Sequence, residues 1–328
     1  MALLKFTSNG IYCEQGDFYI DPWRPVERAV ITHAHSDHAR WGMKSYLAHP
    51  ITAAMMRHRI GQNISVDEVS YNNTTFINGV KISLHPAGHI PGSSQVRVEF
   101  GGEVWVAAGD YKLDVDGISE PFDPVKCHAF ITESTFGLPI YEWKQPAILN
   151  QEINNWWDIN ASAKKTSVIY CYSLGKAQRI LNALDGQGKV FVHGAVHQSN
   201  EVLASCGLAL RESIYLDKNV APKELEGAMI LAPPSTQGSA WTAKFKNLAE
   251  ANASGWMTLR GARRRMNVEK GLVISDHADW NSLITAVKST GAEKVIVTHG
   301  YTDVFAKYLS ENGWNAITEK TEFGEEEV

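Results

Sequence analysis

The chain has 328 residues, of which 44% are hydrophobic and 20% are charged, the composition of a globular protein with an ample core. Its formal net charge of −5 at pH 7 argues against a general polyanion-binding surface, although bound cations or a local basic groove would still admit a nucleic acid. The chain lacks an apolar run of about 18 residues and a secretory signal, and its cysteines are scattered, so we expect a cytoplasmic protein with reduced thiols and no membrane contact.

Short strand-like runs dominate residues 1–144. Gly10–Tyr12, Phe18–Pro22 and Val80–Leu84 are short strand-like segments, separated by turns that contain glycine and proline. Such a density of short strands is typical of a β-sandwich. We therefore expect residues 1–144 to form the N-terminal part of a sandwich domain.

The segment H-x-H-x-D-H holds four candidate metal ligands within six residues. They are His33, His35, Asp37 and His38, and the apolar run Ala29–Thr32 immediately precedes them as a buried strand. Neutral imidazole binds Zn²⁺, Fe and Mn²⁺, and a carboxylate adds a hard oxygen ligand. Because ligands in one tight turn cannot all reach a single ion, the spacing indicates two adjacent ions. A histidine-rich surface loop is the alternative interpretation.

Other runs in this part also end on a ligand or acid–base side chain. His89 lies at a turn rich in glycine and proline, Asp110 follows the run 104–109, and Glu133 ends the run 129–133. If these polar residues were scattered at random through the core or the surface, they would not recur at the ends of predicted strands. Taken singly, His89 reads as an ordinary turn residue and Glu133 as a capping or salt-bridging carboxylate.

Residues 145–267 change to alternating helices and strands, which predicts a parallel α/β module. Helices are expected at 148–160, from 176 and at 196–205, and strands at 167–172, 190–192 and 229–231. Trp156 and Trp157 are expected to pack a helix onto the sheet rather than to stack bases.

A loop and an arginine group in this segment are candidate phosphate contacts. Ser173, Gly175 and Lys176 follow a strand and open a helix, a geometry that offers backbone N–H groups to phosphate. Arg264 belongs to an arginine group that a solvated loop explains equally well. Its place ahead of His277 favours contact with a phosphate backbone.

The C-terminal part, residues 268–328, contains strand-like runs that end at His277 and at His299. If these histidines complete the metal site, the middle segment is an insertion and residues 268–328 complete the first domain. The tail from Thr321 is acidic, and we expect it to be frayed.

The motifs, in this order, resemble those of the metallo-β-lactamase superfamily and its β-CASP branch. H-x-H-x-D-H, His89 in A-G-H-x-x-G-S and Asp110 in G-D match the superfamily, whereas Glu133, His277 and His299 look like motifs A, B and C of the branch. The resemblance covers nearly the whole chain and implies an α/β fold: an αββα sandwich with an inserted α/β β-CASP cap domain. Chain length and the short insertion are most similar to the bacterial ligase-associated DNA exonucleases.

The resemblance also implies a ligand set and catalytic roles. Seven side chains would hold two divalent ions, zinc or manganese: His33, His35 and His89 one ion, Asp37, His38 and His299 the other, and Asp110 both. Hydroxide activated between the ions would attack the phosphorus.

Further roles follow from the same resemblance. His277 would act as general acid, and Glu133 would orient its ring. Asp37 counts among the catalytic residues as well as the ligands, and Asp21 would support the ligand loop without binding metal. The loop at Ser173 resembles the phosphate-binding loop of β-CASP insertions.

These features predict a metal-dependent DNA exonuclease that hydrolyses phosphodiester bonds from the 5′ end in DNA repair. Nucleic acid is the implied partner, together with a repair DNA ligase and a helicase. A β-CASP ribonuclease in RNA 3′-end processing or decay is the near alternative, because RNA presents the same phosphodiester. His299 departs from the valine typical of cross-link repair nucleases at motif C, so their 5′-phosphate specificity does not transfer simply.

Two other classes are more distant. A small-molecule metallo-hydrolase would use the same metals, but it does not need a cap that closes over a polymer. A non-catalytic binding subunit would have lost ligands, whereas every expected ligand position is filled in this chain.

Overall fold

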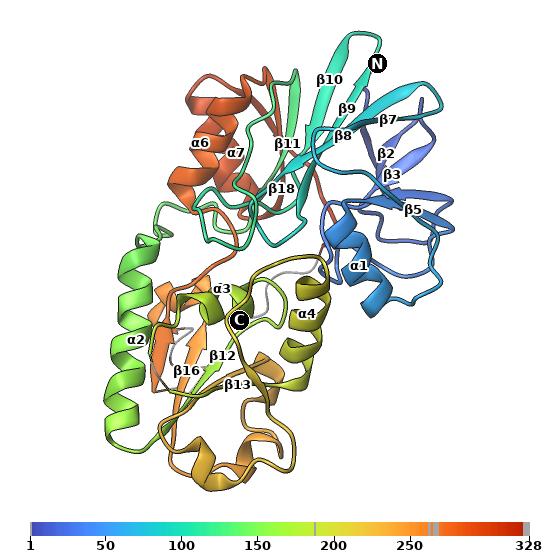
Figure 1. Cartoon of the computed structure of the whole chain (residues 1–328). Helices are drawn as coiled ribbons and strands as arrows, with labels where there is room; N and C mark the ends of the chain where they lie inside the picture. Colours follow the sequence, from blue (N-terminus) through green and yellow to red (C-terminus); the bar gives the residue numbers. More distant parts are fainter. Residues whose placement is uncertain (1, 187, 262–263, 265–268, 324–328) are drawn as a thin grey trace. The chain divides into compact units, whose positions relative to one another are not determined.

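The computed structural model describes residues 2–186, 188–261, 264 and 269–323. They form two compact units (Figure 1). The first comprises the chain up to Val115, Ser119–Glu142 and the chain from His277. The second comprises Asp116–Ile118 and Trp143–Asp276, so it is an insertion in the first.

In the described part of the first unit, two sheets face each other. The strands of the first sheet are β1 (Lys5–Thr7), β2 (Gly10–Cys13), β3 (Phe18–Ile20), β4 (Arg28–Val30), β5 (Ser45–Ala48) and β6 (Val66–Glu68). They follow one another in chain order, antiparallel from β1 to β3 and parallel from β3 to β6.

The second sheet joins strands from both ends of the chain. Its strands are β7 (Thr74–Ile77), β8 (Val80–Pro86), β9 (Ser94–Phe100), β10 (Glu103–Ala107), β11 (Ala129–Ser134), β18 (Lys294–Gly300) and β19 (Asn315–Thr318). They lie in the order β19-β18-β11-β10-β9-β8-β7. β10, β11, β18 and β19 are parallel, so their carboxyl ends meet at one edge of the sheet.

Helices cover the outer faces of both sheets. α1 (Pro50–Arg59) packs on the first sheet through Met56, and α6 (Trp280–Thr290) and α7 (Thr302–Glu311) lie next to β11 and β18 (Figure 1). Alternate residues of β11 serve two cores: Ile131 faces the first sheet, and Phe130 packs with α6 and α7. This burial on both faces explains the continuous apolar run. The four layers confirm the predicted αββα sandwich.

The second unit is built on a parallel sheet. Its strands are β12 (Thr166–Tyr170), β13 (Val190–Val192), β14 (Ile214–Tyr215), β15 (Met229–Ala232), β16 (Leu248–Ala253) and β17 (Lys270–Leu272), in the order β14-β13-β15-β12-β16-β17. Its helices are α2 (Pro146–Ser162), α3 (Lys176–Ala183) and α4 (Gly194–Ser205), with 3₁₀ turns η1 (Pro222–Leu225), η2 (Pro234–Thr236), η3 (Thr242–Lys244) and η4 (Gly255–Thr258).

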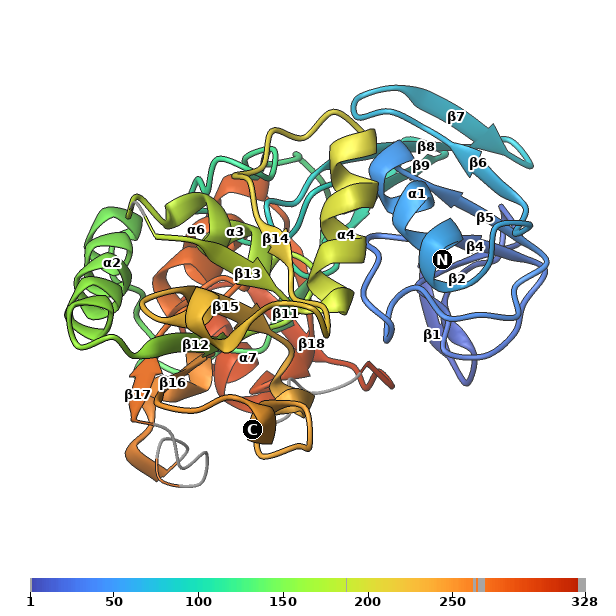
Figure 2. The same cartoon turned by 60° about the horizontal axis from the view of Figure 1, so that its bottom comes forward.

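The sequence pattern of the second unit predicts α2, β12, α3, β13, α4 and β15, but it misses β14 and β16. Trp156 and Trp157 are buried where α2 packs on the sheet, as expected, and Figure 2 shows α4 beside β14. The run expected to end as a strand at His277 differs from the prediction. Its strand, β17, pairs with β16 and already ends at Leu272. The chain then leaves this sheet to enter the first unit at His277, nine residues beyond the expected start of the C-terminal part. No helix in the described ranges is both long and apolar enough to cross a membrane.

His49 begins α1 and predicts a pH dependence of stability. Its ring stacks on Tyr71 with centroids 3.9 Å apart, and Nδ1 accepts a hydrogen bond from the N–H of Ile51. Burial lowers the pKa of His49 to about 4. An imidazole in the unfolded chain has a pKa of about 6.5, so this residue's stabilisation, at most about 3 kcal/mol, is complete above that pH and declines as the pH falls toward 4.

The variant His49→Asn keeps a helix-capping oxygen but does not titrate in this range. We expect it to lose less free energy of unfolding than the wild-type protein between neutral pH and pH 4. Urea unfolding of both proteins across this range measures the difference. Equal losses would show that His49 does not carry this pH dependence.

Candidate metal centre

The predicted ligands of the first unit converge where several strands end. The H-x-H-x-D-H segment follows β4, His89 follows β8, Asp110 follows β10, and His299 lies near the end of β18. Ligand atoms of His33, His35, His89 and Asp110 all lie within 4.8 Å of one another. The structure therefore brings residues far apart in the sequence into one cluster.

Asp110 stands at the middle of this cluster. Its Oδ2 atom lies 3.6 Å from His33 Nε2, 3.4 Å from His38 Nε2 and 3.8 Å from His89 Nε2. These distances are long for hydrogen bonds, but they resemble the separation of about 3.3–3.6 Å between two ligands of one tetrahedral ion. Among the described residues, the buried Nε2 atoms of His33 and His38 have no hydrogen-bond partner. This donor set fits a divalent metal ion.

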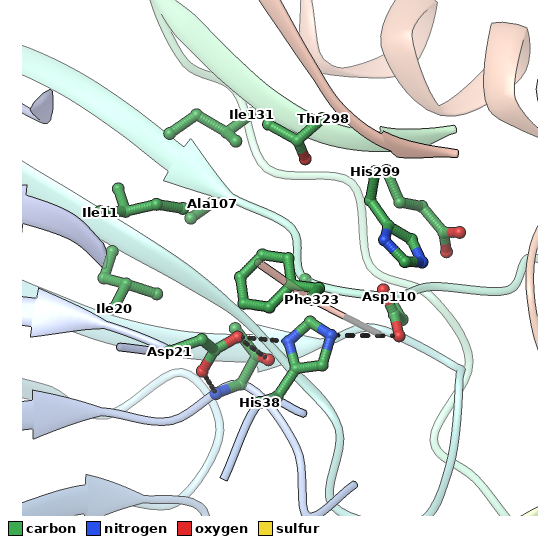
Figure 3. Close-up of a pocket in the computed structure, with 13 residues that line it drawn as sticks. Ile11, Ile20, Asp21, His38, Ala107, Asp110, Ile131, Thr298, His299 and Phe323 are labelled. Atoms are coloured by element: carbon green, nitrogen blue, oxygen red, sulfur yellow. Dashed lines mark hydrogen bonds and ion pairs between the residues drawn. The ribbon is translucent and has the colours of Figure 1, made fainter. Parts of the chain in front are cut away.

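A small cavity of about 20 Å³ lies beside this cluster (Figure 3). His38, Asp110 and His299 line it together with Asp21 and Phe323. A space of this size accommodates about one water molecule. Ile11, Ile20 and Ile131 make much of the remaining lining apolar, so only the side formed by His38, Asp110 and His299 is suited to an ion and its water.

Contacts to the Nδ1 atoms of His38 and His33 fix which ring nitrogens face Asp110. Asp21 accepts hydrogen bonds from the backbone N–H and the hydroxyl of Thr32, and its Oδ2 lies 2.8 Å from His38 Nδ1. Because the Thr32 hydroxyl donates to Asp21, its oxygen is free to accept from His33 Nδ1, 3.1 Å away. Both imidazoles thus direct Nε2 at Asp110, as metal-binding histidines do.

The role of Asp21 gives a testable prediction. Asp21→Asn should weaken metal binding about tenfold to a hundredfold, because the carboxylate that orients His38 is lost while the ligands remain. Titration of metal-stripped protein against a chelating indicator measures this affinity. Asp17→Asn is the matched control, since Asp17 is an exposed carboxylate that pairs with Arg28. Equal affinities of the two variants would contradict the supporting role.

Charges inside the cluster shift its pKa values in opposite directions. Burial lowers the pKa of His33 well below its usual value, and the neighbouring histidines lower it further. Burial also acts to lower the pKa of His38, but Asp110 and Asp37 outweigh it and hold that pKa well above the usual value. Burial opposes ionisation of Asp110, yet His38 and His277 keep its pKa well below the usual range. A metal ion that binds His38 must displace its proton. Metal affinity should therefore decrease as the pH is lowered.

Glycine is required immediately before Asp110. Gly109 has a φ of 58°, and a Cβ atom at this position would lie 2.7 Å from the Cβ and hydroxyl of Thr32. Any other residue would combine a strained backbone with a clash against the residue that orients His33. Gly109 therefore permits the backbone turn that positions Asp110 and the close packing of this turn against Thr32.

Asp37 and His299 are also near this cavity. Asp37 Oδ2 lies 3.6 Å from His38 Nε2, and the side chain is partly exposed. His299 has a φ of 53°, and its backbone carbonyl accepts a hydrogen bond from the Ser134 hydroxyl at 2.6 Å. In Figure 3 its ring points toward Asp110. The assignment of these two residues to a second ion stays a prediction.

His277 and Glu133 form a buried pair next to the cluster. His277 Nδ1 lies 2.9 Å from Glu133 Oε2, and the rings of His277 and His89 are 4.7 Å apart. Glu133 also accepts hydrogen bonds from the backbone N–H of Tyr111 at 2.7 Å and from the Thr135 hydroxyl at 2.6 Å. A carboxylate held in this way orients an imidazole. Glu133, His277 and Asp110 could also share a cation, since their ligand atoms lie within 4.8 Å of one another.

The C-terminal segment packs against the cluster at Phe323, so the expected fraying is wrong for residues 321–323, whereas residues 324–328 lie outside the described residues. The Phe323 ring stacks on His38 with centroids 4.2 Å apart and an angle of 12°, and its edge faces His299. A single aromatic residue in an acidic tail gives no sequence signal for this contact. Thr32 was also missed as the link between Asp21 and His33, although its place beside the motif could have indicated it.

The predicted phosphate contacts lie in the second unit. The backbone N–H of Gly175 donates to Gln178, and the Gln178 amide donates to the carbonyl of Ser173. Lys176 is fully buried, with Nζ 3.5 Å from Asp276. Phosphate binding by this loop therefore remains a prediction that requires these groups to exchange partners. Arg264 is exposed, as a phosphate contact needs, whereas its neighbours Arg263 and Arg265 lie outside the described residues.

Comparison with known proteins adds independent findings. Residues 261–318 match the family model RMMBL, described as a Zn-dependent metallo-hydrolase RNA specificity domain. A protein named "Probable DNA ligase" from Opitutus terrae is 30% identical over 317 residues, which are 95% of this chain and 30% of that protein. A crystal structure of a protein of unknown function from Enterococcus faecalis V583 has a TM-score of 0.57 at 12% identity, covering 91% of this chain and 80% of that one, and shows a shared fold.

Other relatives match a smaller part of the chain. "Endoribonuclease YSH1" of Saccharomyces cerevisiae is 30% identical over 124 residues, 37% of this chain and 15% of the relative. "Cleavage and polyadenylation specificity factor subunit 3" of Dictyostelium discoideum is 28% identical over 126 residues, 37% of this chain and 16% of the relative. The chain thus spans about a third or less of the length of these curated relatives.

Proposed function

Because the chain belongs to the β-CASP branch of the metallo-β-lactamase superfamily, we propose that it is a DNA exonuclease that acts from the 5′ end in DNA repair. The observation that carries the choice of DNA is the similarity to the protein named a probable DNA ligase, which extends over 95% of this chain. The endoribonuclease relative matches only 37%. The nearest functional partners would be a repair ligase and a helicase in the cytoplasm.

The residues of the centre have distinct roles in this proposal. His33, His35 and His89 would hold one divalent ion, Asp37, His38 and His299 a second, and Asp110 both. When bound, zinc or manganese ions supply Lewis acidity, which lowers the pKa of water and neutralises charge on phosphate oxygens. Asp21 and Thr32 keep the rings of His38 and His33 turned toward the site.

His277 would provide the proton for the leaving oxygen. Its Nδ1 faces Glu133, so Nε2 would be the nitrogen that passes a proton to the leaving oxygen. Since Glu133 is itself fixed by Tyr111 and Thr135, the imidazole has little freedom to rotate. This geometry suits general acid catalysis at one side of the phosphate.

A ribonuclease of RNA 3′-end processing or decay is the second candidate. The observations that favour it are the match of residues 261–318 to an RNA specificity domain and the endoribonuclease relatives. Base stacking and phosphate contacts do not distinguish the two polymers, whereas a contact to the 2′-hydroxyl would.

One experiment separates these functions. Metal-stripped protein is given single-stranded DNA and RNA of the same sequence, labelled at the 5′ or the 3′ end, and Zn²⁺, Mn²⁺ or Mg²⁺ is added back in turn. Early release of mononucleotides from the 5′ end of DNA is the expected result. Preferential cutting of RNA would favour the ribonuclease, and cleavage of neither polymer would contradict both nucleases and favour a small-molecule hydrolase.

A further inference from the structure

A surface pocket of about 430 Å³ lies on the first unit beside the metal-binding segment. Its lining combines cationic and aromatic side chains with a residue of the H-x-H-x-D-H segment: Trp23, Arg24, Ser36, Arg40, Trp41 and Arg59. Neither the metal centre nor the proposed proton donor uses these arginines or tryptophans. Cationic groups beside exposed aromatic rings are the elements from which single-stranded nucleic acid sites are built.

Arg40 ties this pocket to the metal centre. Its Nε donates to the backbone carbonyl of Asp37 at 3.2 Å, and an Nη atom donates to the carbonyl of Trp23 at 3.2 Å. Arg24 also donates to the carbonyl of Trp23, at 3.1 Å. These bonds hold the two guanidinium groups near each other, next to the segment that carries the ligands. A phosphate bound there would therefore lie close to the reacting one.

The C-terminal segment already places an anion and a ring in this region. Both oxygens of the Glu322 carboxylate accept hydrogen bonds from the Arg24 guanidinium, at 2.5 and 2.8 Å, and its backbone carbonyl accepts from Arg40. The next residue, Phe323, stacks on His38 and meets Trp23 edge-on at 5.7 Å. Paired hydrogen bonds from arginine suit carboxylate and phosphate equally. Glu322 and Phe323 thus resemble a phosphate followed by a base.

Trp41 supplies a surface on which a base can stack. It is 79% exposed, the highest exposure among the large hydrophobic residues of the described chain. It neighbours Arg40 in the sequence and lines the same pocket. An indole left in water at such a position gains contact area when an unpaired base covers it.

We propose that Arg24, Arg40 and Trp41 form a subsite for a single-stranded nucleic acid, with a backbone phosphate on the arginines and an unpaired base on Trp41. Glu322 and Phe323 occupy part of this subsite until a strand displaces them. The inference rests on the proposed function, because it takes the substrate to be a nucleic acid. It adds a preference for an unpaired strand, since bases inside a duplex are not free to stack on protein.

Binding of fluorescent single-stranded oligothymidylate to the metal-free protein tests the subsite. Trp41→Ala is expected to weaken binding about fivefold to a hundredfold, and Trp41→Phe should recover part of the loss. Arg24→Gln should weaken binding and reduce the slope of log affinity against log salt by about one. Glu322→Gln should strengthen binding, because it removes the competing carboxylate. A blunt duplex should bind wild type and Trp41→Ala equally.

Lys44→Gln is the matched control, because Lys44 is an exposed cation on the same loop that pairs with Glu27. Hydrolysis of bis(p-nitrophenyl) phosphate, too small to reach the subsite, should be the same in wild type, Trp41→Ala, Trp41→Phe and Lys44→Gln. If wild type binds and cuts the oligonucleotide but Arg24→Gln and Trp41→Ala behave like the control, the subsite is wrong and the proposed function stands. If wild type neither binds nor cuts any nucleic acid, the proposed function fails and the subsite with it.

Discussion

Replacing His277 by alanine is expected to lower nuclease turnover by about a hundredfold to ten-thousandfold, the usual contribution of a general acid. The reason is the loss of the imidazole that Glu133 holds beside the cluster, at 2.9 Å from its carboxylate. Metal content should stay unchanged if His277 is a proton donor and not a ligand. Turnover of a labelled oligonucleotide and metal analysis of the same preparation measure both quantities.

Two further variants sharpen this test. His58→Ala removes an exposed histidine near the end of α1 and should retain full activity. Glu133→Gln should lower kcat with little change in KM. The Tyr111 N–H would hold the amide oxygen, so the NH2 group would face Nδ1 and favour the other tautomer of the ring. Unchanged cleavage by His277→Ala would remove this residue from the mechanism. Loss of metal would instead place it among the ligands.

Replacing Asp110 by asparagine should weaken metal binding by at least about a hundredfold, the upper end of the effect of residues that only support ligands. Asp110 is buried, and its Oδ2 lies within 3.8 Å of Nε2 atoms from His33, His38 and His89. The amide keeps the volume but removes the only carboxylate placed among these three rings in the described structure. Nuclease activity should fall with the metal content.

Asp114→Asn is the appropriate comparison. Asp114 follows Asp110 in the same loop, but its carboxylate is partly exposed and pairs with Lys112 at 2.8 Å. Equilibrium competition with a chelator should separate the two variants clearly. If Asp110→Asn retained wild-type metal affinity, the cluster would not be a metal centre organised around this carboxylate.

Most of the site could be predicted because its residues follow strands. A strand buried on both faces gives an unbroken apolar run, and the first polar residues after it are easy to recognise, as at His33 and Asp110. Parallel strands bring such residues to one edge, which is why separate motifs indicated one cluster. The αββα layers could be predicted for the same reason.

Contacts that depend on tertiary packing could not be predicted. Phe323 reaches His38 from a segment without periodicity, and Lys176 is buried against Asp276 although its loop pattern favours phosphate. The run at Leu272 is apolar on either side of the point where the chain leaves one sheet, so its pattern does not reveal the change of unit. Local sequence carries no information about partners that lie far along the chain.

The order in which the proposed ligands Asp110 and His299 are made would have a consequence in the cell. Asp110 and His299 lie 189 positions apart in the sequence, and the inserted unit lies mostly between them. At usual rates of translation, His299 leaves the ribosome about 10–40 s after Asp110. A nascent or prematurely terminated chain therefore lacks β18 and cannot assemble the complete centre. Synthesis order would therefore keep the proposed nuclease inactive until β18 has been made.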